Sequence, residues 1–120
     1  MKRAALAVLL AFCAGAANAH YWDGRVLAET CVQGEGVEKG VPGALEVEAG
    51  ACMGYILGVA EVLEDDLEAI DIPDDVQVQT LVRIVREYLE ENPMELDQPA
   101  RKLVRRALVE AYPTTPQQKK

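Results

Sequence analysis

The sequence ALEVEAGACMGYILGVAEVLEDDL, from Ala44 to Leu67, has an apolar residue every three or four positions. This spacing places the apolar side chains on one stripe of an α-helix and gathers the acidic residues on another side. The apolar positions are Leu45, Ala49, Cys52, Ile56, Val59, Leu63 and Leu67. We therefore expect a long central helix here.

A second stripe with the same period predicts a helix over about residues 78–91. Asp74 or Asp75 is the expected cap at its start, because a short acidic side chain can accept a hydrogen bond from the first turn. The helix is expected to end at Asn92, since a residue before proline is pushed out of the helical region. The outer face of this helix carries arginines, each four residues before a glutamate.

Two further helices complete the predicted fold. The last one is expected to start near Pro99, with Asp97 or Gln98 as its cap, and to stop before Pro113. The first is expected to be short, over about residues 23–32. The sequence GEGVEKGVPG that follows it has four glycines in ten residues. It lacks the GK[ST] ending of a phosphate-binding loop, so we interpret it as a flexible connection.

The first nineteen residues have the features of an export signal. Lys2 and Arg3 precede an apolar run, and Ala17-Asn18-Ala19 matches a small-x-small cleavage site. We expect cleavage after Ala19, which gives a periplasmic domain over residues 20–113 and a flexible tail over residues 114–120. No later segment is long and uncharged enough to span a bilayer, so no membrane insertion is expected after cleavage.

Two cysteines remain in the mature chain, Cys31 and Cys52. A pair of cysteines in an oxidising compartment indicates a disulfide, which would join the first helix to the central one. A metal site or a reactive thiol is the competing interpretation, but no histidine lies near either cysteine in the sequence. The predicted fold class is therefore all-α: a small single domain of about four helices with one disulfide.

The charge of the chain excludes several classes of partner. The full sequence has twelve basic and twenty acidic residues, and removal of the signal takes away Lys2 and Arg3, which leaves a net charge of about −10. Such a protein repels nucleic acids and anionic membranes and attracts basic partners.

Several motifs together resemble one known family. They are Cys52-Met53-Gly54-Tyr55-Ile56-Leu57-Gly58 with a cysteine in the preceding helix, an Ile-Pro-Asp turn, and a final helix that ends in Ala-Tyr-Pro. This combination resembles the Rap/Tai family of immunity proteins, which neutralise peptidoglycan amidases delivered by type VI secretion. The resemblance implies an all-helical fold, a homodimer, and a protruding segment that blocks the amidase. Members commonly have a second cysteine pair, where this chain has Asp71 and Thr114.

Gly54 and Gly58 lie four residues apart, on one face of the central helix. This spacing allows the backbone of a neighbouring segment to approach closely, so we interpret both glycines, with Tyr55 beside them, as a helix-packing motif within the domain. A seam between two copies of the chain is the alternative. Tyr55 is expected to be a core residue with a hydrogen-bonded hydroxyl.

The fifteen positions from the end of the central helix into the following turn include eight acidic residues and no basic residue. We predict that they bind the partner, while a solvated helix end is the alternative. They are Glu61, Glu64, Asp65, Asp66, Glu68, Asp71, Asp74 and Asp75.

An enzyme is not expected. The chain has no serine, and its one histidine, His20, would become the mature N-terminus. A serine or Cys–His nucleophile and a histidine-based copper site therefore lack their residues, and no metal or cofactor is predicted. Paired carboxylates alone would allow a glycosidase, but a small helical domain has little room for a sugar cleft. An acid-stress chaperone of the HdeA type, also small, helical and exported, is the alternative function.

Overall fold

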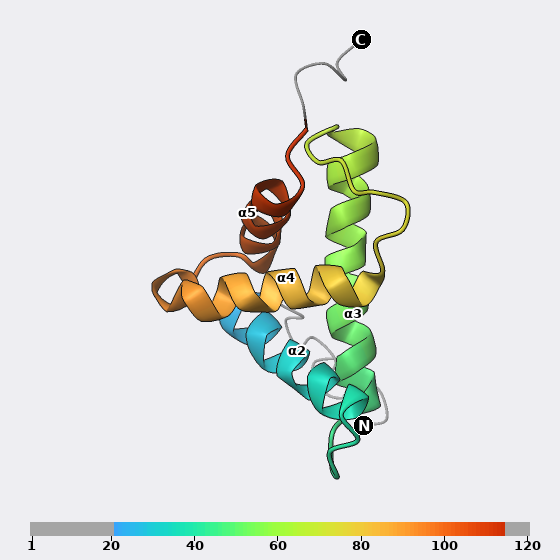
Figure 1. Ribbon diagram of the computed structural model, residues 1–120. Helices are drawn as coiled ribbons and strands as arrows, with labels where there is room; N and C mark the ends of the chain where they lie inside the picture. Colours follow the sequence, from blue (N-terminus) through green and yellow to red (C-terminus); the bar gives the residue numbers. More distant parts are fainter. Residues whose placement is uncertain (1–20, 115–120) are drawn as a thin grey trace, which may run out of the picture.

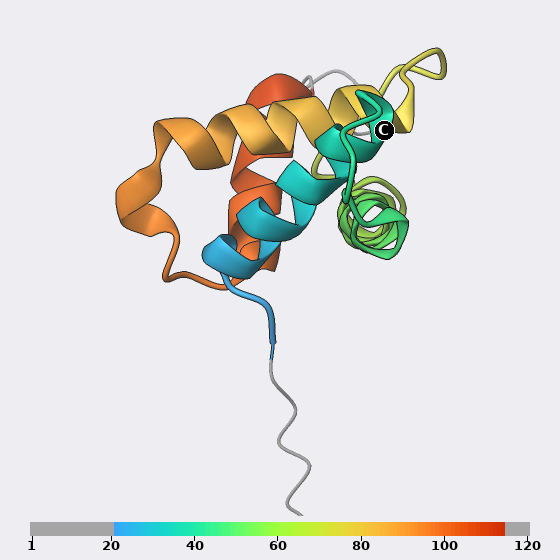
Figure 2. The ribbon, with the colours of Figure 1, turned by 90° about the horizontal axis from the view of Figure 1, so that it is seen from below.

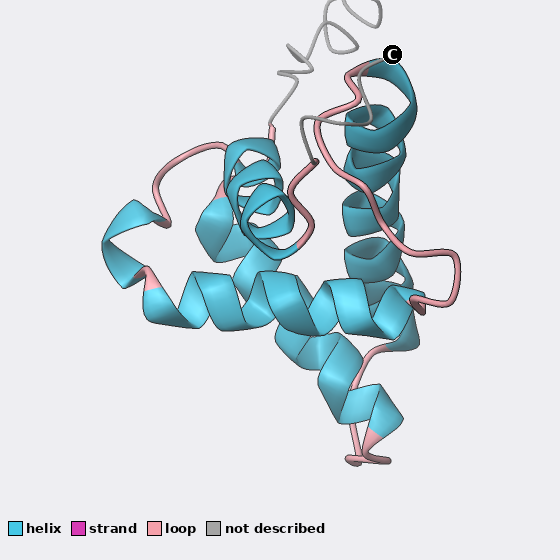
Figure 3. Ribbon diagram, turned by 45° about the horizontal axis from the view of Figure 1, so that its top comes forward, coloured by secondary structure: helices cyan, strands magenta, loops and turns pink. Residues whose placement is uncertain are grey.

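The computed structural model describes residues 21–114, which form four α-helices joined by short connections (Figures 1 and 3). The helices are α2 (Gly24–Glu38), α3 (Glu46–Glu61), α4 (Val78–Glu91) and α5 (Ala100–Ala111). A π-helical turn, η1 (Val62–Asp66), extends α3, and a 3-10 turn, η2 (Pro93–Glu95), follows α4. No strand occurs in residues 21–114, so the predicted all-α class is confirmed. The predicted signal peptide and the tail beyond Thr114 lie outside the described residues.

The helices surround one aliphatic core. In Figure 1, α3 stands upright and α4 crosses it. α5 lies above α4, beside the upper part of α3, and α2 runs below α4 to the lower end of α3. Each helix contributes fully buried side chains to the core, and these include Leu27, Ile56, Val85, Leu103 and Leu108. Within the described part of the chain, no helix is long and apolar enough to cross a membrane.

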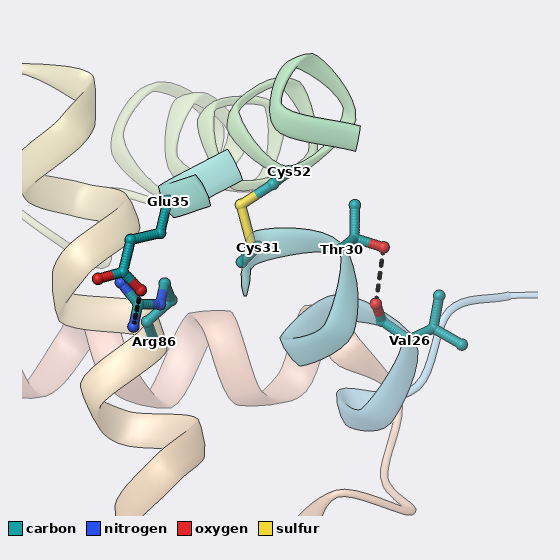
Figure 4. The surroundings of a disulfide bond; sticks show 6 residues. All are labelled: Val26, Thr30, Cys31, Glu35, Cys52 and Arg86. Atoms are coloured by element: carbon teal, nitrogen blue, oxygen red, sulfur yellow. Dashed lines mark hydrogen bonds and ion pairs between the residues drawn. A yellow bond between two sulfur atoms is a disulfide. The ribbon is translucent and has the colours of Figure 1, made fainter. Parts of the chain in front are cut away.

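The disulfide joins α2 to α3, as predicted. Cys31 and Cys52 are bonded, with their Cα atoms 5.0 Å apart, and both side chains are buried in the core (Figure 4). Beside the disulfide, the hydroxyl of Thr30 donates to the carbonyl oxygen of Val26. The bond therefore fixes the middle of α2 against the middle of α3.

The first helix is longer than predicted. It was expected to end at about Val32, but α2 continues to Glu38 and includes Gly34 and Gly36 from the predicted flexible connection. A Cβ at Gly34 would lie 3.2 Å from the Cα of Ala49. The close packing of α2 against α3 thus favours the helical conformation at residues that have low helix propensity of their own.

Two of the predicted helix caps are wrong. α4 begins after Gln77 instead of Asp74 or Asp75, and α5 begins after Pro99; neither cap residue makes a side-chain hydrogen bond. The main chain satisfies the start of α5, because the N–H of Ala100 donates to the carbonyl oxygen of Trp22 over 2.8 Å. This partner is distant in the sequence, so local cap preferences could not reveal it.

Candidate partner-binding surface

The eight acidic residues predicted to bind a partner lie in one continuous segment, at the top of α3 in Figure 1 and in the loop that returns from there to the start of α4. Glu61 ends α3, three of them lie in η1, and the other four lie in the loop of residues 67–77. Seven are exposed, and Glu64 is partly buried. We call this segment, residues 61–75, the acidic platform.

The loop of the acidic platform is held by hydrogen bonds to η1 and to the end of α5. The N–H of Ile72 donates to the carboxylate of Glu64 over 3.3 Å. The N–H of Asp71 donates to the carbonyl oxygen of Tyr112 over 3.1 Å. Glu64 therefore has a structural role, and the exposed carboxylates around it are the better candidates for contact with a partner.

Main-chain hydrogen bonds join the loop after η1 to the end of α5. These are the two segments in which members of the Rap/Tai family commonly have a second cysteine pair. Asp71 and Thr114 stand at those places in this chain. Next to them, Ile70 and Pro113 form an isolated antiparallel β-bridge, beside the bond between Asp71 and Tyr112. The loop is thus tied to the end of α5 without a covalent bond.

The expectation that Gly54 and Gly58 pack against another segment of the domain is wrong. A Cβ built at either position would have no described atom within 4 Å, apart from the neighbouring backbone of α3 itself. Both glycines lie on the exposed side of α3. Each one disfavours the helix by about 1 kcal/mol relative to alanine, and no contact within the described chain compensates for this.

Tyr55 is partly buried, on the side of α3 that faces Trp22. The two rings are stacked, with their centroids 5.1 Å apart and their planes 8° from parallel. Burial raises the pKa of Tyr55, while the charge of Arg101 acts in the opposite direction. Tyr55 therefore packs at the edge of the core, whereas a core residue was expected from the sequence.

The exposed side of α3 and η1 also carries aliphatic residues, which were not predicted from the sequence. Val47, Leu57 and Val62 are 81%, 41% and 47% exposed. Apolar residues are found on every side of α3, whereas a surface helix ordinarily has a polar outer face. That lack of a polar face was visible in the sequence and could have marked this surface.

Basic residues line an open hollow of about 740 Å³ between α4 and α5. Lys102 and Arg105 contribute to it, together with Arg106, whose guanidinium lies 3.0 Å from the carboxylate of Glu95. The Tyr88 hydroxyl donates to the same carboxylate over 3.1 Å. Burial and this hydrogen bond raise the pKa of Tyr88, and the charge of Glu95 raises the pKa of Arg106.

A second hollow, of about 400 Å³, lies between α2, α3 and α4. Three of its charged groups interact with one another: Arg86 lies 2.6 Å from Glu35, which also bonds to Lys39. The hydrogen bond from Lys39, together with the charge of Arg86, lowers the pKa of Glu35. Cys52 lines the hollow but is part of the disulfide. Among residues 21–114, no group of three or more histidine, cysteine, aspartate or glutamate residues could hold a metal ion.

The geometry therefore offers exposed surfaces for a protein partner. A search of curated proteins finds no match for the chain. A family model described as Rap1a immunity proteins matches residues 9–114, which include both cysteines and the whole acidic platform. Because this match covers nearly the full sequence, the chain belongs to the family of Rap1a immunity proteins.

Proposed function

We propose that this protein is a periplasmic immunity protein that binds and neutralises a peptidoglycan amidase delivered by type VI secretion. Membership of the immunity family supports the binding of a cognate effector protein. The resemblance described above supports the amidase as the target. The export signal expected over residues 1–19, with cleavage after Ala19, supports the periplasm as the compartment.

The acidic platform is the observation that carries the proposed binding site. Seven exposed carboxylates lie on a segment tied to η1 and α5, so the partner meets a surface that is already ordered. An ordered surface reduces the entropy cost of binding. The negative charge attracts a basic or polar active-site groove and mainly raises the association rate and the specificity.

In this proposal the protein acts by occlusion, with no reaction of its own and no cofactor. The acidic platform covers the groove of the amidase and so prevents peptidoglycan from entering. The protein acts as a homodimer, which the family resemblance implies; sedimentation of the free protein tests this state.

Charge reversal tests the proposed site. The variant has Glu61, Asp65 and Asp66 changed to lysine; Glu64 is left intact because it holds the loop. We expect association with the target amidase to slow by about tenfold or more at low salt. The difference should shrink at high salt, where charges are screened beyond about 10 Å.

A matched control changes Arg101, Lys102 and Arg105 on α5 to glutamate; this adds negative charge outside the acidic platform and should not slow association. Periplasmic co-expression provides the cellular test. If cells that produce the amidase lyse equally with and without this protein, the proposed function is wrong. Suppression of protein aggregation at low pH, without amidase inhibition at neutral pH, would favour a chaperone of the HdeA type instead.

A further inference from the structure

The outer face of α3 carries no charge over three turns. Residues 49–60 include no charged side chain, although the side of the helix opposite the core faces outward. Figure 2, which views α3 nearly end on, shows the other helices on one side of it only. This outer face is formed by Val47, Gly50, Gly54, Leu57, Gly58 and Val62, all of them exposed.

The three glycines of this face differ from the glycines of α2. A Cβ at Gly24 would lie 2.5 Å from the side chain of Leu103, and one at Gly34 would meet Ala49, so packing within the chain explains both. At Gly50, Gly54 and Gly58, nothing described lies within 4 Å of such a Cβ. The helix thus carries three unfavourable residues, one turn apart, which no contact in the described chain explains.

Glycines spaced by four residues leave a shallow groove along a helix, in which another backbone can approach closely. The exposed side chains of Val47, Leu57 and Val62 lie along this groove and can add apolar contacts. Such apolar contacts would lengthen the lifetime of a complex. The acidic platform contributes little to that lifetime, because charges at a rim mainly raise the rate of association.

We propose that the outer face of α3 is the apolar part of the effector-binding surface, and that it receives a segment of the effector that is small or apolar in its middle and basic at the end that meets the acidic platform. The inference rests on the function proposed above. The two surfaces are continuous, because Glu61 and Asp65 follow Gly54 and Gly58 along the same side of α3 and η1.

The charges argue against a second copy of this chain as the occupant. The face has acids at both ends, Glu46 at its foot and Glu61 and Asp65 at its head. Two copies packed antiparallel would place foot acids beside head acids, and a parallel pair would place like ends together. Either arrangement sets carboxylates against carboxylates, whereas a partner with basic residues is attracted.

Substitution of Gly54 and Gly58 by alanine separates binding from folding. Two methyl groups fit the open space of the free protein and favour the helix, so the thermal midpoint should rise by about 4 °C or more. The same methyl groups would keep a closely packed partner away. Affinity for the target amidase should therefore fall by about tenfold or more.

Glu110→Ala, on the outer side of α5, is the control and should leave affinity unchanged. An unchanged affinity of the stabilised double glycine variant would overturn the docking of α3. If the charge-reversal variant alone binds more slowly, the proposed function stands and the α3 face is excluded. If the wild-type protein does not bind the amidase at all, the proposed function itself fails. If the glycine variant instead converts a dimer to a monomer in sedimentation, the occupant is a second copy and the proposal is wrong.

Discussion

Loss of the Cys31–Cys52 disulfide should destabilise this domain strongly, because the bond closes a loop between two helices that share one core. The two cysteines are 21 residues apart in the sequence, and both side chains are buried. In the chain-entropy model, release of a loop of this length from the unfolded chain costs about 3 kcal/mol of stability. Domains of this size have only about 5–15 kcal/mol in total.

Two perturbations separate the cross-link from the packing of the sulfur atoms. Reduction of the wild-type protein removes the bond but keeps both sulfurs, so its free energy of unfolding should fall by the loop contribution alone. The variant with Cys31→Ala and Cys52→Ala also loses buried atoms, and about 1 kcal/mol more is expected for each site. The thermal midpoint of the reduced protein should be lower by about 12–24 °C.

Urea unfolding followed by far-UV circular dichroism measures both effects. The unfolded state without the bond is more expanded, so the dependence of the unfolding free energy on urea should also become steeper. Equal urea midpoints for the oxidised and reduced wild-type proteins would show that the cross-link contributes nothing and would refute the loop-entropy argument. Two free thiols in protein purified from the periplasm would refute the pairing itself.

Three other substitutions test particular contacts. Gly24→Ala should lower stability by about 1–3 kcal/mol in thermal unfolding, because the added Cβ would lie 2.9 Å from the Cα of Leu96. Asp23→Ala removes the side chain that accepts from the first turn of α2, and calorimetry should show a loss of about 1 kcal/mol. Glu64→Gln weakens the bond to the N–H of Ile72, so hydrogen exchange there should accelerate while global stability changes by less than about 1 kcal/mol; unchanged exchange would show that this bond does not hold the loop.

The helices could be predicted from the sequence, whereas several of their ends could not. A central helix was expected from Ala44 to Leu67, and α3 with η1 covers Glu46–Asp66. The repeat of apolar residues predicts the helix because it extends over several turns. Its middle is buried, at Ala49, Cys52, Ile56 and Leu63, whereas Leu45 and Leu67 at its ends are exposed. Helix ends depend on single contacts. α2 continues beyond Gly34 because Gly34 packs on Ala49 of α3. That contact is distant in the sequence, so the residues around Gly34 alone could not predict it.

The cluster of acidic residues in the acidic platform could be predicted from the sequence, but the contacts that fix its conformation could not. Eight acids without a base are visible in the sequence, and the structure adds that Glu64 bonds to Ile72 and that Ile70 pairs with Pro113. These partners lie 8 and 43 residues apart, so only the folded chain brings them together. The distinction matters for mutagenesis, because reversal of Glu64 would disturb the loop as well as its charge.

The glycines of α3 show why a motif needs its surroundings before it can be interpreted. Gly54 and Gly58 have the spacing of a packing motif, and in the sequence a partner within the chain is as compatible with that spacing as one outside it. The structure decides between these, since the described chain leaves both positions open while it fills the space beside Gly24 and Gly34. In the proposed complex, this open face of α3 docks against the effector next to the acidic platform. Replacement of these glycines by alanine would stabilise the helix, and the proposed docking of the effector on α3 explains why glycine is present instead.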